Sequence, residues 1–211
     1  MSLWFIVSLL GIFVLTPVHF LSVEHKKLDT KYGEEKGKKI GTYLGFLSGW
    51  GYFLFLFGIW LSPQEKFALF IFDEPLLTID PIIISVGDLL LGVIFLIPGI
   101  YLGIKGVTDI GLAVAETHRA DEVVSRGLYS RVRHPQYLGA WFSHLGITFL
   151  LSAYFSLLVT PIIILRDFIV CRKEERELVR EFGSAYEEYR QSVPMLIPRI
   201  RTATEEGAAP E

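Results

Sequence analysis

The sequence predicts an all-α integral membrane protein. Of its 211 residues, 51% are apolar, the mean hydropathy is +0.44, and apolar runs of about twenty residues, enough to span a bilayer, recur along the chain. Soluble domains of this size are usually less apolar. We expect about five membrane-inserted helices, the last two forming a helical hairpin, and then a cytosolic amphipathic helix at the C-terminal end.

The N-terminal part, residues 1–104, is expected to contain three spans. Its apolar runs cover 3–21, 40–61 and 82–104. The first run has no basic start and no small-residue cleavage site, so we expect a retained helix rather than a secretory signal. Residues 23–39 carry six lysines and predict a solvated loop or a short amphipathic helix.

The remaining chain begins with a polar stretch, 105–134, followed by two shorter apolar runs, 135–152 and 154–170. About seventeen residues at 1.5 Å each reach only about 26 Å, less than the 30 Å hydrocarbon core. These runs therefore predict a tilted or partly inserted hairpin. We expect a charged helix over about 171–191 and a flexible tail over 200–211.

Basic residues predict the orientation in the membrane. Lysines and arginines crowd the segment after the first span and the chain from 105 onward, whereas the segment between spans two and three has only Lys66. Cytosolic loops are enriched in these residues, so we expect the N-terminus outside and both polar regions in the cytosol.

Cysteine and histidine usage argues against disulfides and metal chemistry. The one cysteine, Cys171, excludes an intramolecular disulfide and a cysteine-based zinc site. The five histidines show no HExxH-like spacing. Neither metal nor nucleic acid is expected as a partner, whereas membrane lipids are. Asp88 and His144 lie inside apolar runs, and a mutual hydrogen bond is expected ahead of a catalytic role.

The segment RVRHPQYLG, residues 131–139, concentrates polar groups where the hairpin begins. Pro135 suits the first position of a helix, which makes His134 the expected N-cap. The N–H groups of Gln136 and Tyr137, with the positive end of the helix dipole, predict an anion site.

Arg131 and Arg133 add positive charge to this anion site. For these two residues alone, an ordinary role as cytosolic membrane anchors stays open. Gly139, one turn further along, leaves room for the close approach of a ligand or a neighbouring helix.

A second polar group follows the hairpin. Arg166, Val170 and Glu174 fall at i, i+4 and i+8 and share one face of a helix that leaves the membrane. Glu174 and Glu175 then reach the level of His134, and a solvated charged face is the alternative. Beyond them an apolar stripe predicts packing along the membrane or against the preceding loop: Leu178, Phe182, Tyr186 and Tyr189.

These motifs together resemble the isoprenylcysteine carboxyl methyltransferases, and the related phospholipid N-methyltransferases share the RHPxYxG part. The resemblance covers about the last 85 residues. The N-terminal 120 residues resemble the family only in being apolar membrane spans. Its motifs, in order, are GLY at 127–129, RHPQYLG at 133–139, EE at 174–175, EFGSAYEEY at 181–189 and VPMLIPR at 193–199.

The resemblance implies methyl transfer from S-adenosylmethionine to a lipid-like methyl acceptor. The chain is then one membrane domain, 1–211, whose residues 105–199 form the cofactor-binding catalytic region. A zwitterionic amino acid with an adenosine and a sulfonium needs an anion site, an acidic partner and flat apolar walls. By similarity, the cofactor contacts fall on Val123, Val124, Tyr129, His134, Pro135, Gln136, Tyr137 and Glu174.

The chain departs from the family pattern at the acceptor. The isoprenylcysteine enzymes have an arginine four residues before the matching glutamate, where this chain has Val170. Arg166 or Lys173 is expected to orient the accepting carboxylate of an isoprenylated cysteine or a related isoprenoid. An amine or alcohol acceptor instead needs a proton acceptor, for which Glu175 or His144 is the candidate.

Three other functions stay open on the sequence. They are a phospholipid N-methyltransferase, a sterol-type membrane reductase that uses NADPH, and a non-enzymatic lipid-binding membrane protein. The reductases share a C-terminal Y…VP pattern, but this chain is short for their fold. A non-enzymatic protein leaves the polar residues around His134 and Glu174 without a purpose.

The expected orientation can be tested with single cysteines in a Cys171→Ser background. A cysteine beside Lys66 should react with a membrane-impermeant thiol reagent on intact cells, and a cysteine beside Lys36 should react only after lysis. The reverse pattern contradicts the orientation, because the cofactor site would then face the side without cofactor.

Overall fold

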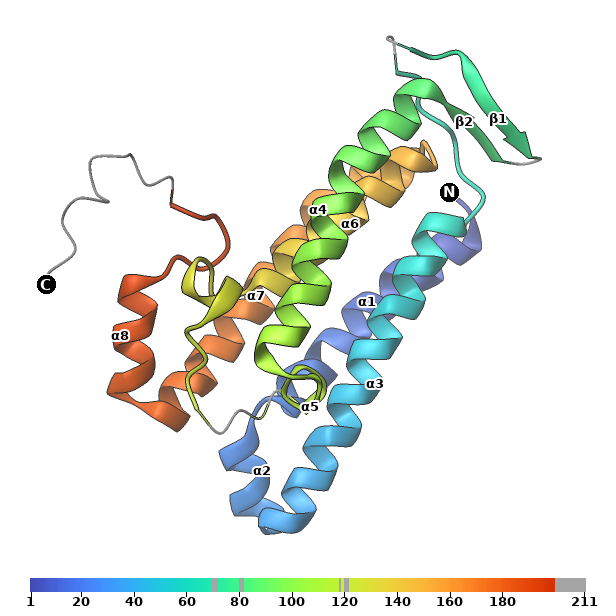
Figure 1. Ribbon diagram of the computed structural model, residues 1–211. Coiled ribbons are helices and arrows are strands. Elements are labelled where there is room, and N and C mark those ends of the chain that lie inside the picture. Colours follow the sequence, from blue (N-terminus) through green and yellow to red (C-terminus); the bar gives the residue numbers. More distant parts are fainter. Residues whose placement is uncertain (70–71, 80–81, 118, 120–121, 200–211) are drawn as a thin grey trace, which may run out of the picture.

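The computed structural model describes residues 1–69, 72–79, 82–117, 119 and 122–199, so the expected tail at 200–211 lies outside the described residues. Helices make up most of the described chain (Figure 1). In chain order they are α1 (Leu3–Ser22), α2 (His25–Tyr32), α3 (Glu34–Leu61), α4 (Val86–Ile110), α5 (Leu112–Thr117), the 3-10 turn η1 (Gly127–Ser130), α6 (Pro135–Leu150), α7 (Tyr154–Phe182) and α8 (Ser184–Ser192).

Four of these helices, α1, α3, α4 and α7, are long and apolar enough to cross a membrane. Helix α6 has 16 residues, which reach about 24 Å and fall short of a full hydrocarbon core. Helices α6 and α7 follow each other after a three-residue turn, as the hairpin prediction requires. The expected helical membrane architecture is therefore confirmed, with four helices of full spanning length.

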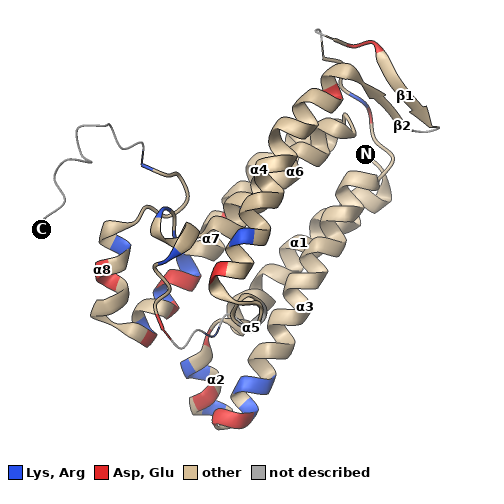
Figure 2. Cartoon of the chain, in the orientation of Figure 1, with Lys and Arg blue, Asp and Glu red and all other residues tan. Residues whose placement is uncertain are grey.

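The two ends of the molecule differ in charge. The N-terminus and the strands β1 (Pro75–Ile79) and β2 (Ile82–Ser85) lie together at one end of the molecule. Helices α2, α5 and α8 lie at the other, which we call the charged end, because most Lys, Arg, Asp and Glu residues gather there (Figure 2). Residues 23–39 and the C-terminal helix therefore share one end, as expected.

The described chain is helical as expected apart from one short β-hairpin, and the third span begins at Val86 rather than at residue 82. β1 and β2 pair antiparallel, with Ile79 opposite Ile82, and β-branched residues favour this extended backbone. Helix α4 begins after them because Ser85 and Asp88 form a capping box. The Asp88 N–H donates to Ser85 Oγ at 3.1 Å, and the Ser85 N–H donates to Asp88 Oδ2 at 2.9 Å.

The expected hydrogen bond between Asp88 and His144 is also wrong. Trp60 Nε1 donates to His144 Nδ1 at 3.0 Å, and His144 Nε2 lies 3.0 Å from Thr160 Oγ1. His144 is 2% exposed, and both of its nitrogens have partners within the helix bundle. It therefore joins α3, α6 and α7 and has no place in the cavity described below.

The second half of the hairpin and the first part of the charged helix are one element. The shared face of Arg166, Val170 and Glu174 predicted one helix that leaves the membrane, and α7 runs unbroken from Tyr154 to Phe182. The charged helix expected over about 171–191 is instead divided at Gly183. Gly183 then adopts φ +59°, a conformation that costs glycine little, and α8 starts at Ser184 in a new direction. Polar residues near 174 consequently stand on a rigid helix that continues from the membrane span.

Glycines allow α4 and α6 to pack at close range. A Cβ on Gly139 would lie 2.7 Å from the Gly103 nitrogen, and one on Gly146 would lie 2.8 Å from the Leu96 nitrogen. Small residues at helix contacts are common in membrane proteins for this reason. Gly139 thus accommodates a neighbouring helix, which is one of its two expected roles.

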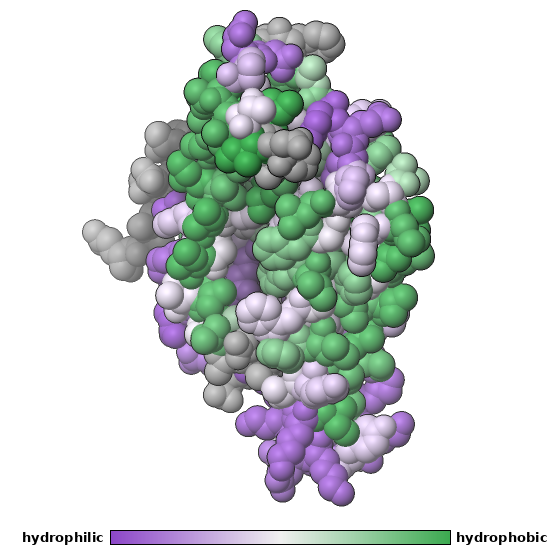
Figure 3. Space-filling model, turned by 90° about the vertical axis from the view of Figure 1, so that its right-hand side faces the viewer, coloured by the Kyte–Doolittle hydropathy of each residue, from purple (hydrophilic) through white to green (hydrophobic). Residues whose placement is uncertain are grey.

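Helices α1, α3 and α7 share a second apolar core that includes Ile12, Leu56 and Ile163. The outer faces of the long helices remain apolar, with Leu10, Phe57 and Ile97 all more than half exposed. Figure 3 shows apolar side chains over the middle of the molecule and hydrophilic ones near its two ends. The chain thus presents a bilayer-facing surface between two polar ends.

Candidate active site

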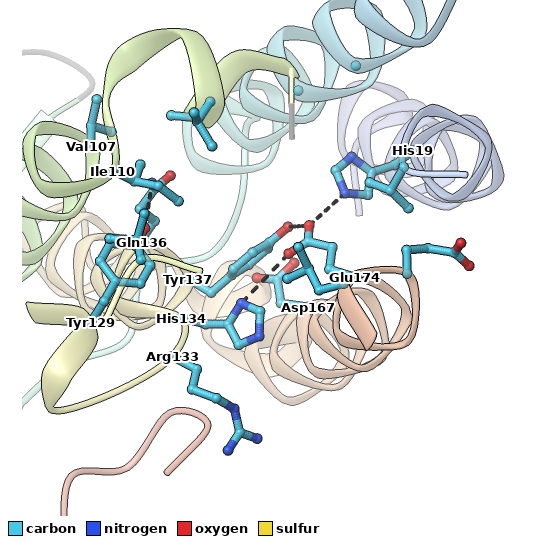
Figure 4. Close-up of a pocket in the computed structure, with 18 of the residues that line it drawn as sticks. His19, Val107, Ile110, Tyr129, Arg133, His134, Gln136, Tyr137, Asp167 and Glu174 are labelled. Atoms are coloured by element: carbon cyan, nitrogen blue, oxygen red, sulfur yellow. Dashed lines mark hydrogen bonds and ion pairs between the residues drawn. The ribbon is translucent and has the colours of Figure 1, made fainter. Parts of the chain in front are cut away.

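A cavity of about 430 Å³ lies between the two packed groups of helices, toward the charged end. Residues of all eight described α-helices line it, α2 and α5 included, together with part of the segment 122–134. Figure 4 shows carboxylates, imidazoles and phenol rings converging in it from different helices. The residues that come together are therefore far apart in the sequence.

The carboxylate of Glu174 is the central polar group of this cavity (Figure 4). His19 Nε2 from α1 lies 3.1 Å from Glu174 Oε1, and the Tyr137 hydroxyl from α6 donates to the same oxygen. His134 Nδ1 lies 3.7 Å from Oε2. Residues of α1 and of the start of α6 thus orient the carboxylate of Glu174, a residue that is only 8% exposed.

The start of α6 forms the opposite wall. Pro135 is its first residue and His134 occupies the N-cap position, as expected, but the His134 side chain makes no cap hydrogen bond. Its imidazole instead lies between Glu174 and Glu175. The N–H groups of Gln136 and Tyr137 are in the first turn and have no intrahelical acceptor, so the helix can receive an anion here.

Glu175 performs a different task from its neighbour, because it does not line the cavity. Arg133 Nε donates to Glu175 Oε1 at 2.6 Å, and His134 Nε2 lies 3.3 Å from the same oxygen. Arg133 Nη1 also donates to the Arg190 carbonyl at 2.7 Å, and the Arg133 N–H donates to the Pro194 carbonyl at 2.9 Å. These bonds hold the chain around residues 190–194 against the start of α6.

Tyr129 lines the cavity from the turn η1. Gln136 Nε2 donates to its hydroxyl at 3.0 Å, and the Tyr189 hydroxyl donates to its carbonyl at 2.7 Å. Burial raises the pKa of Tyr129, so its phenol stays neutral. The expected apolar stripe packs here, because Tyr186, Tyr189 and Val193 form a cluster against Val123.

A buried ion pair lies at the membrane side of the cavity. Arg166 Nη1 donates to Asp167 Oδ1 at 2.7 Å, and the guanidinium stacks over the Tyr52 ring at 4.3 Å. Tyr52 and Trp141 donate to Asp167 Oδ2 at 3.1 and 3.0 Å. The site therefore holds a compensated charge pair where the sequence predicted a single positive charge.

Most of the expected site residues meet in the cavity. Those that line it are Val123, Val124, Tyr129, His134, Gln136, Tyr137, Arg166 and Glu174. Pro135 is buried and starts α6 without lining the cavity, and Glu175 and Lys173 do not line it either. Lys173 Nζ donates to Glu24 at 2.7 Å and to Glu177 at 2.9 Å, so it does not replace the arginine missing at Val170.

The sequence reasoning missed several polar cavity residues, among them His19, His25, Ser48, Tyr52 and Asp167. His19 and Asp167 are ionisable groups inside apolar runs, a signal that marks functional or paired positions. Ser48 and Tyr52 carry no such signal, because hydroxyls are common in spans. Among the described residues, no group of three or more His, Cys, Asp and Glu side chains is placed to hold a metal ion.

The role of Glu175 can be tested by its effect on stability. Glu175→Gln leaves Arg133 buried without its carboxylate, so the free energy of unfolding should fall by about 3 to 5 kcal/mol. Glu187→Gln removes the acid of a more exposed pair with Arg190 and should change the free energy little. Chemical unfolding in detergent micelles measures both, and equal effects contradict the structural role.

Comparison with known proteins bears directly on this region. Residues 88–185 match the sequence profile of a family described as phospholipid methyltransferase. This segment runs from the first turn of α4 to the start of α8 and includes Tyr129, His134, Tyr137 and Glu174. It leaves out α1 and α3, which supply His19 and Ser48.

Several characterised proteins are similar to parts of the chain. A protein-S-isoprenylcysteine O-methyltransferase of Schizosaccharomyces pombe is 36% identical over 112 residues, which cover 50% of this chain and 48% of that protein. A methanethiol S-methyltransferase of Bradyrhizobium diazoefficiens is 36% identical over 87 residues, covering 39% of this chain and 32% of its own length. A Delta(14)-sterol reductase of Mus musculus is 29% identical over 97 residues, which cover 43% of this chain and 22% of that protein.

The matched segments thus span less than half the length of these relatives. No solved structure matches the chain significantly. The expected resemblance to the isoprenylcysteine methyltransferases is confirmed by the family match and by the yeast relative. Residues 88–185, which build most of the cavity wall, are therefore similar to the phospholipid methyltransferase family.

Proposed function

We propose that this chain is an integral membrane methyltransferase that transfers a methyl group from S-adenosylmethionine to a lipid-like acceptor. The observation that carries the proposal is the cavity in which a buried carboxylate, Glu174, faces the start of α6. The relatives that are methyltransferases support the same activity.

The cavity residues suit the chemistry of S-adenosylmethionine. Its carboxylate needs N–H donors and positive charge, which the first turn of α6 and His134 provide. Its ammonium needs a carboxylate, which Glu174 provides. Its adenosine needs flat walls, and Tyr129 and Tyr186 line the cavity. When bound, this cofactor supplies a methyl group activated by the sulfonium charge.

The contribution of the chain to methyl transfer is orientation and desolvation. A carboxylate nucleophile needs no general base, so the residues must bring the acceptor into line and exclude water. The hydrogen bonds of His19 and Tyr137, together with the His134 imidazole at 3.7 Å, hold Glu174 in place before any ligand binds. A preorganised carboxylate of this kind avoids reorganisation during the reaction.

The position of the cavity suits two ligands of opposite solubility. Polar groups of α2, α7 and the segment 122–134 face it at the charged end, which we place in the cytosol with the N-terminus outside. A water-soluble cofactor enters there. Phe46, Trp50 and Phe53 of α3 line the cavity and are also about half exposed toward the bilayer. A lipid tail enters between these side chains.

Arg166 is the residue that we propose to orient an accepting carboxylate. It lines the cavity at the membrane side, close to where a lipid headgroup arrives. Asp167 and Tyr52 hold the guanidinium in place, and Asp167 offsets its charge. The carboxylate of an isoprenylated cysteine or a related isoprenoid is the acceptor that fits, and an amine-headed phospholipid is the alternative.

The cofactor assignment can be tested by isothermal titration of the detergent-solubilised protein with S-adenosylhomocysteine. His134→Ala and Glu174→Ala should each weaken binding by about 1 to 3 kcal/mol, the range for losing a charge-assisted partner. Arg131, which was expected to add charge to the anion site, is exposed and does not line the cavity, so Arg131→Ala should bind like wild type. Wild-type affinity in both site variants, or binding of NADP in place of S-adenosylhomocysteine, contradicts the proposal.

The acceptor can be tested with labelled cofactor and two substrate classes, N-acetyl farnesyl cysteine and amine-headed lipids. The double variant Arg166→Gln, Asp167→Asn removes the pair without leaving a buried charge. It should lower kcat/KM for the cysteine compound about tenfold or more. Arg172→Ala, an exposed position on the same helix, is the control. Unchanged kcat/KM in the double variant contradicts the role of Arg166.

A further inference from the structure

His25 is a buried histidine whose side chain has no hydrogen-bond partner among the described residues. It is the first residue of α2, is 6% exposed, and lines the main cavity. Neither ring nitrogen makes a hydrogen bond, and the nearest carboxylate oxygen, Glu181 Oε2, is 3.8 Å from Nδ1. Buried polar groups are normally hydrogen-bonded, so this imidazole calls for an explanation.

The position of His25 is set by ion pairs of α2. Lys173 of α7 donates to Glu24 at 2.7 Å, directly before His25. Arg119 donates twice to Asp29, at 2.8 and 3.0 Å, and holds the pKa of that carboxyl below its usual value. A side chain on an element held in this way keeps its place at the cavity wall.

The surroundings of His25 define the ligand group that it can bind. Three other cavity residues at this end are acids: Glu122, Glu177 and Glu181. Glu177 accepts from Lys173 and Arg180, and Glu122 accepts from Arg126, so cations offset part of this negative charge. The remaining lone pairs of the three carboxylates favour a ligand group with N–H or O–H donors. A ligand that displaces water from this part of the cavity must itself hydrogen-bond to the imidazole, which would otherwise lose its bonds to that water. A nucleoside, with ribose hydroxyls and an exocyclic amine, has both donors and acceptors to offer.

The spacing along α7 supports an elongated ligand. Glu174 and Glu181 are seven residues apart, which corresponds to about 10 Å along a helix. Glu174 faces the start of α6, where an amino acid group fits, and Glu181 stands beside His25. One molecule that reaches both needs an amino acid group at one end and a polar ring system at the other.

We propose that His25 binds the adenosyl group of the methyl donor by a hydrogen bond from its imidazole. This inference rests on the proposed function, which supplies the donor. It assigns a cofactor contact to α2, outside the segment that matches the family. The N-terminal half of the chain then contributes to cofactor binding as well as to the membrane anchor.

The test compares two ligands in isothermal titration of the detergent-solubilised full chain. 5′-Methylthioadenosine has the adenosyl group without the amino acid, whereas S-adenosylhomocysteine has both. His25→Phe fills the same space without hydrogen bonds and should weaken both ligands by about the same factor, roughly tenfold. His25→Gln keeps a donor and an acceptor and should restore part of the affinity. Lys31→Ala, on the exposed face of α2, should leave both affinities unchanged.

Unchanged affinities in a folded His25→Phe variant overturn the inference, as does weakening for S-adenosylhomocysteine alone. If neither ligand binds the wild type, the proposed function fails and the inference fails with it. A second measurement uses only the wild-type protein. In wild-type protein with ¹⁵N-labelled histidine, the His25 imidazole signals should shift when 5′-methylthioadenosine is added. Signals that stay in place overturn the assignment.

Discussion

The buried carboxylate of Glu174 is the group on which the arrangement of the site depends. A carboxylate removed from water is costly unless charged or polar partners surround it. Its partners come from α1 and α6, while the carboxylate itself stands on α7. These three helices must therefore meet at one point, and the cavity forms where they meet.

The adjacent Glu175 shows how one short motif serves two purposes. Successive residues of a helix point about 100° apart, so two neighbouring glutamates cannot face the same group. Glu174 faces the cavity, and Glu175 pairs with Arg133 and His134 behind it. His134 lies between the two carboxylates and so connects the ligand site to the support of the C-terminal segment.

The ion pair of Arg166 and Asp167 shows how charge is accommodated in the apolar part of the chain. Asp167 is fully buried, and Arg166, Tyr52 and Trp141 all donate to it. An isolated charge at this depth would be strongly disfavoured. The pair keeps a guanidinium at the cavity wall, in a region where the chain lacks the arginine of the isoprenylcysteine enzymes.

The sequence by itself determined the membrane class, the approximate spans and the residues around His134 and Glu174. These follow from local rules, because hydropathy, the helix-start preference of proline and ordered motifs act over a few neighbouring positions. The same rules missed the strand at 82–85, since β-branched residues suit a strand and an apolar span equally well. They also missed the break at Gly183 between α7 and α8, since one glycine in a polar helical pattern is not enough to predict a helix end.

Only the tertiary structure decided which polar groups share the cavity. His19 and Glu174 are 155 residues apart, and no periodicity relates them. The same holds for His25, which a sequence reading places on a solvated lysine-rich segment, whereas packing buries it at the cavity wall. Glu175 likewise stays outside the cavity, because the orientation of α7 about its own axis turns this side chain toward Arg133. Such contacts depend on how whole helices pack, and packing is a property of pairs of elements rather than of local sequence.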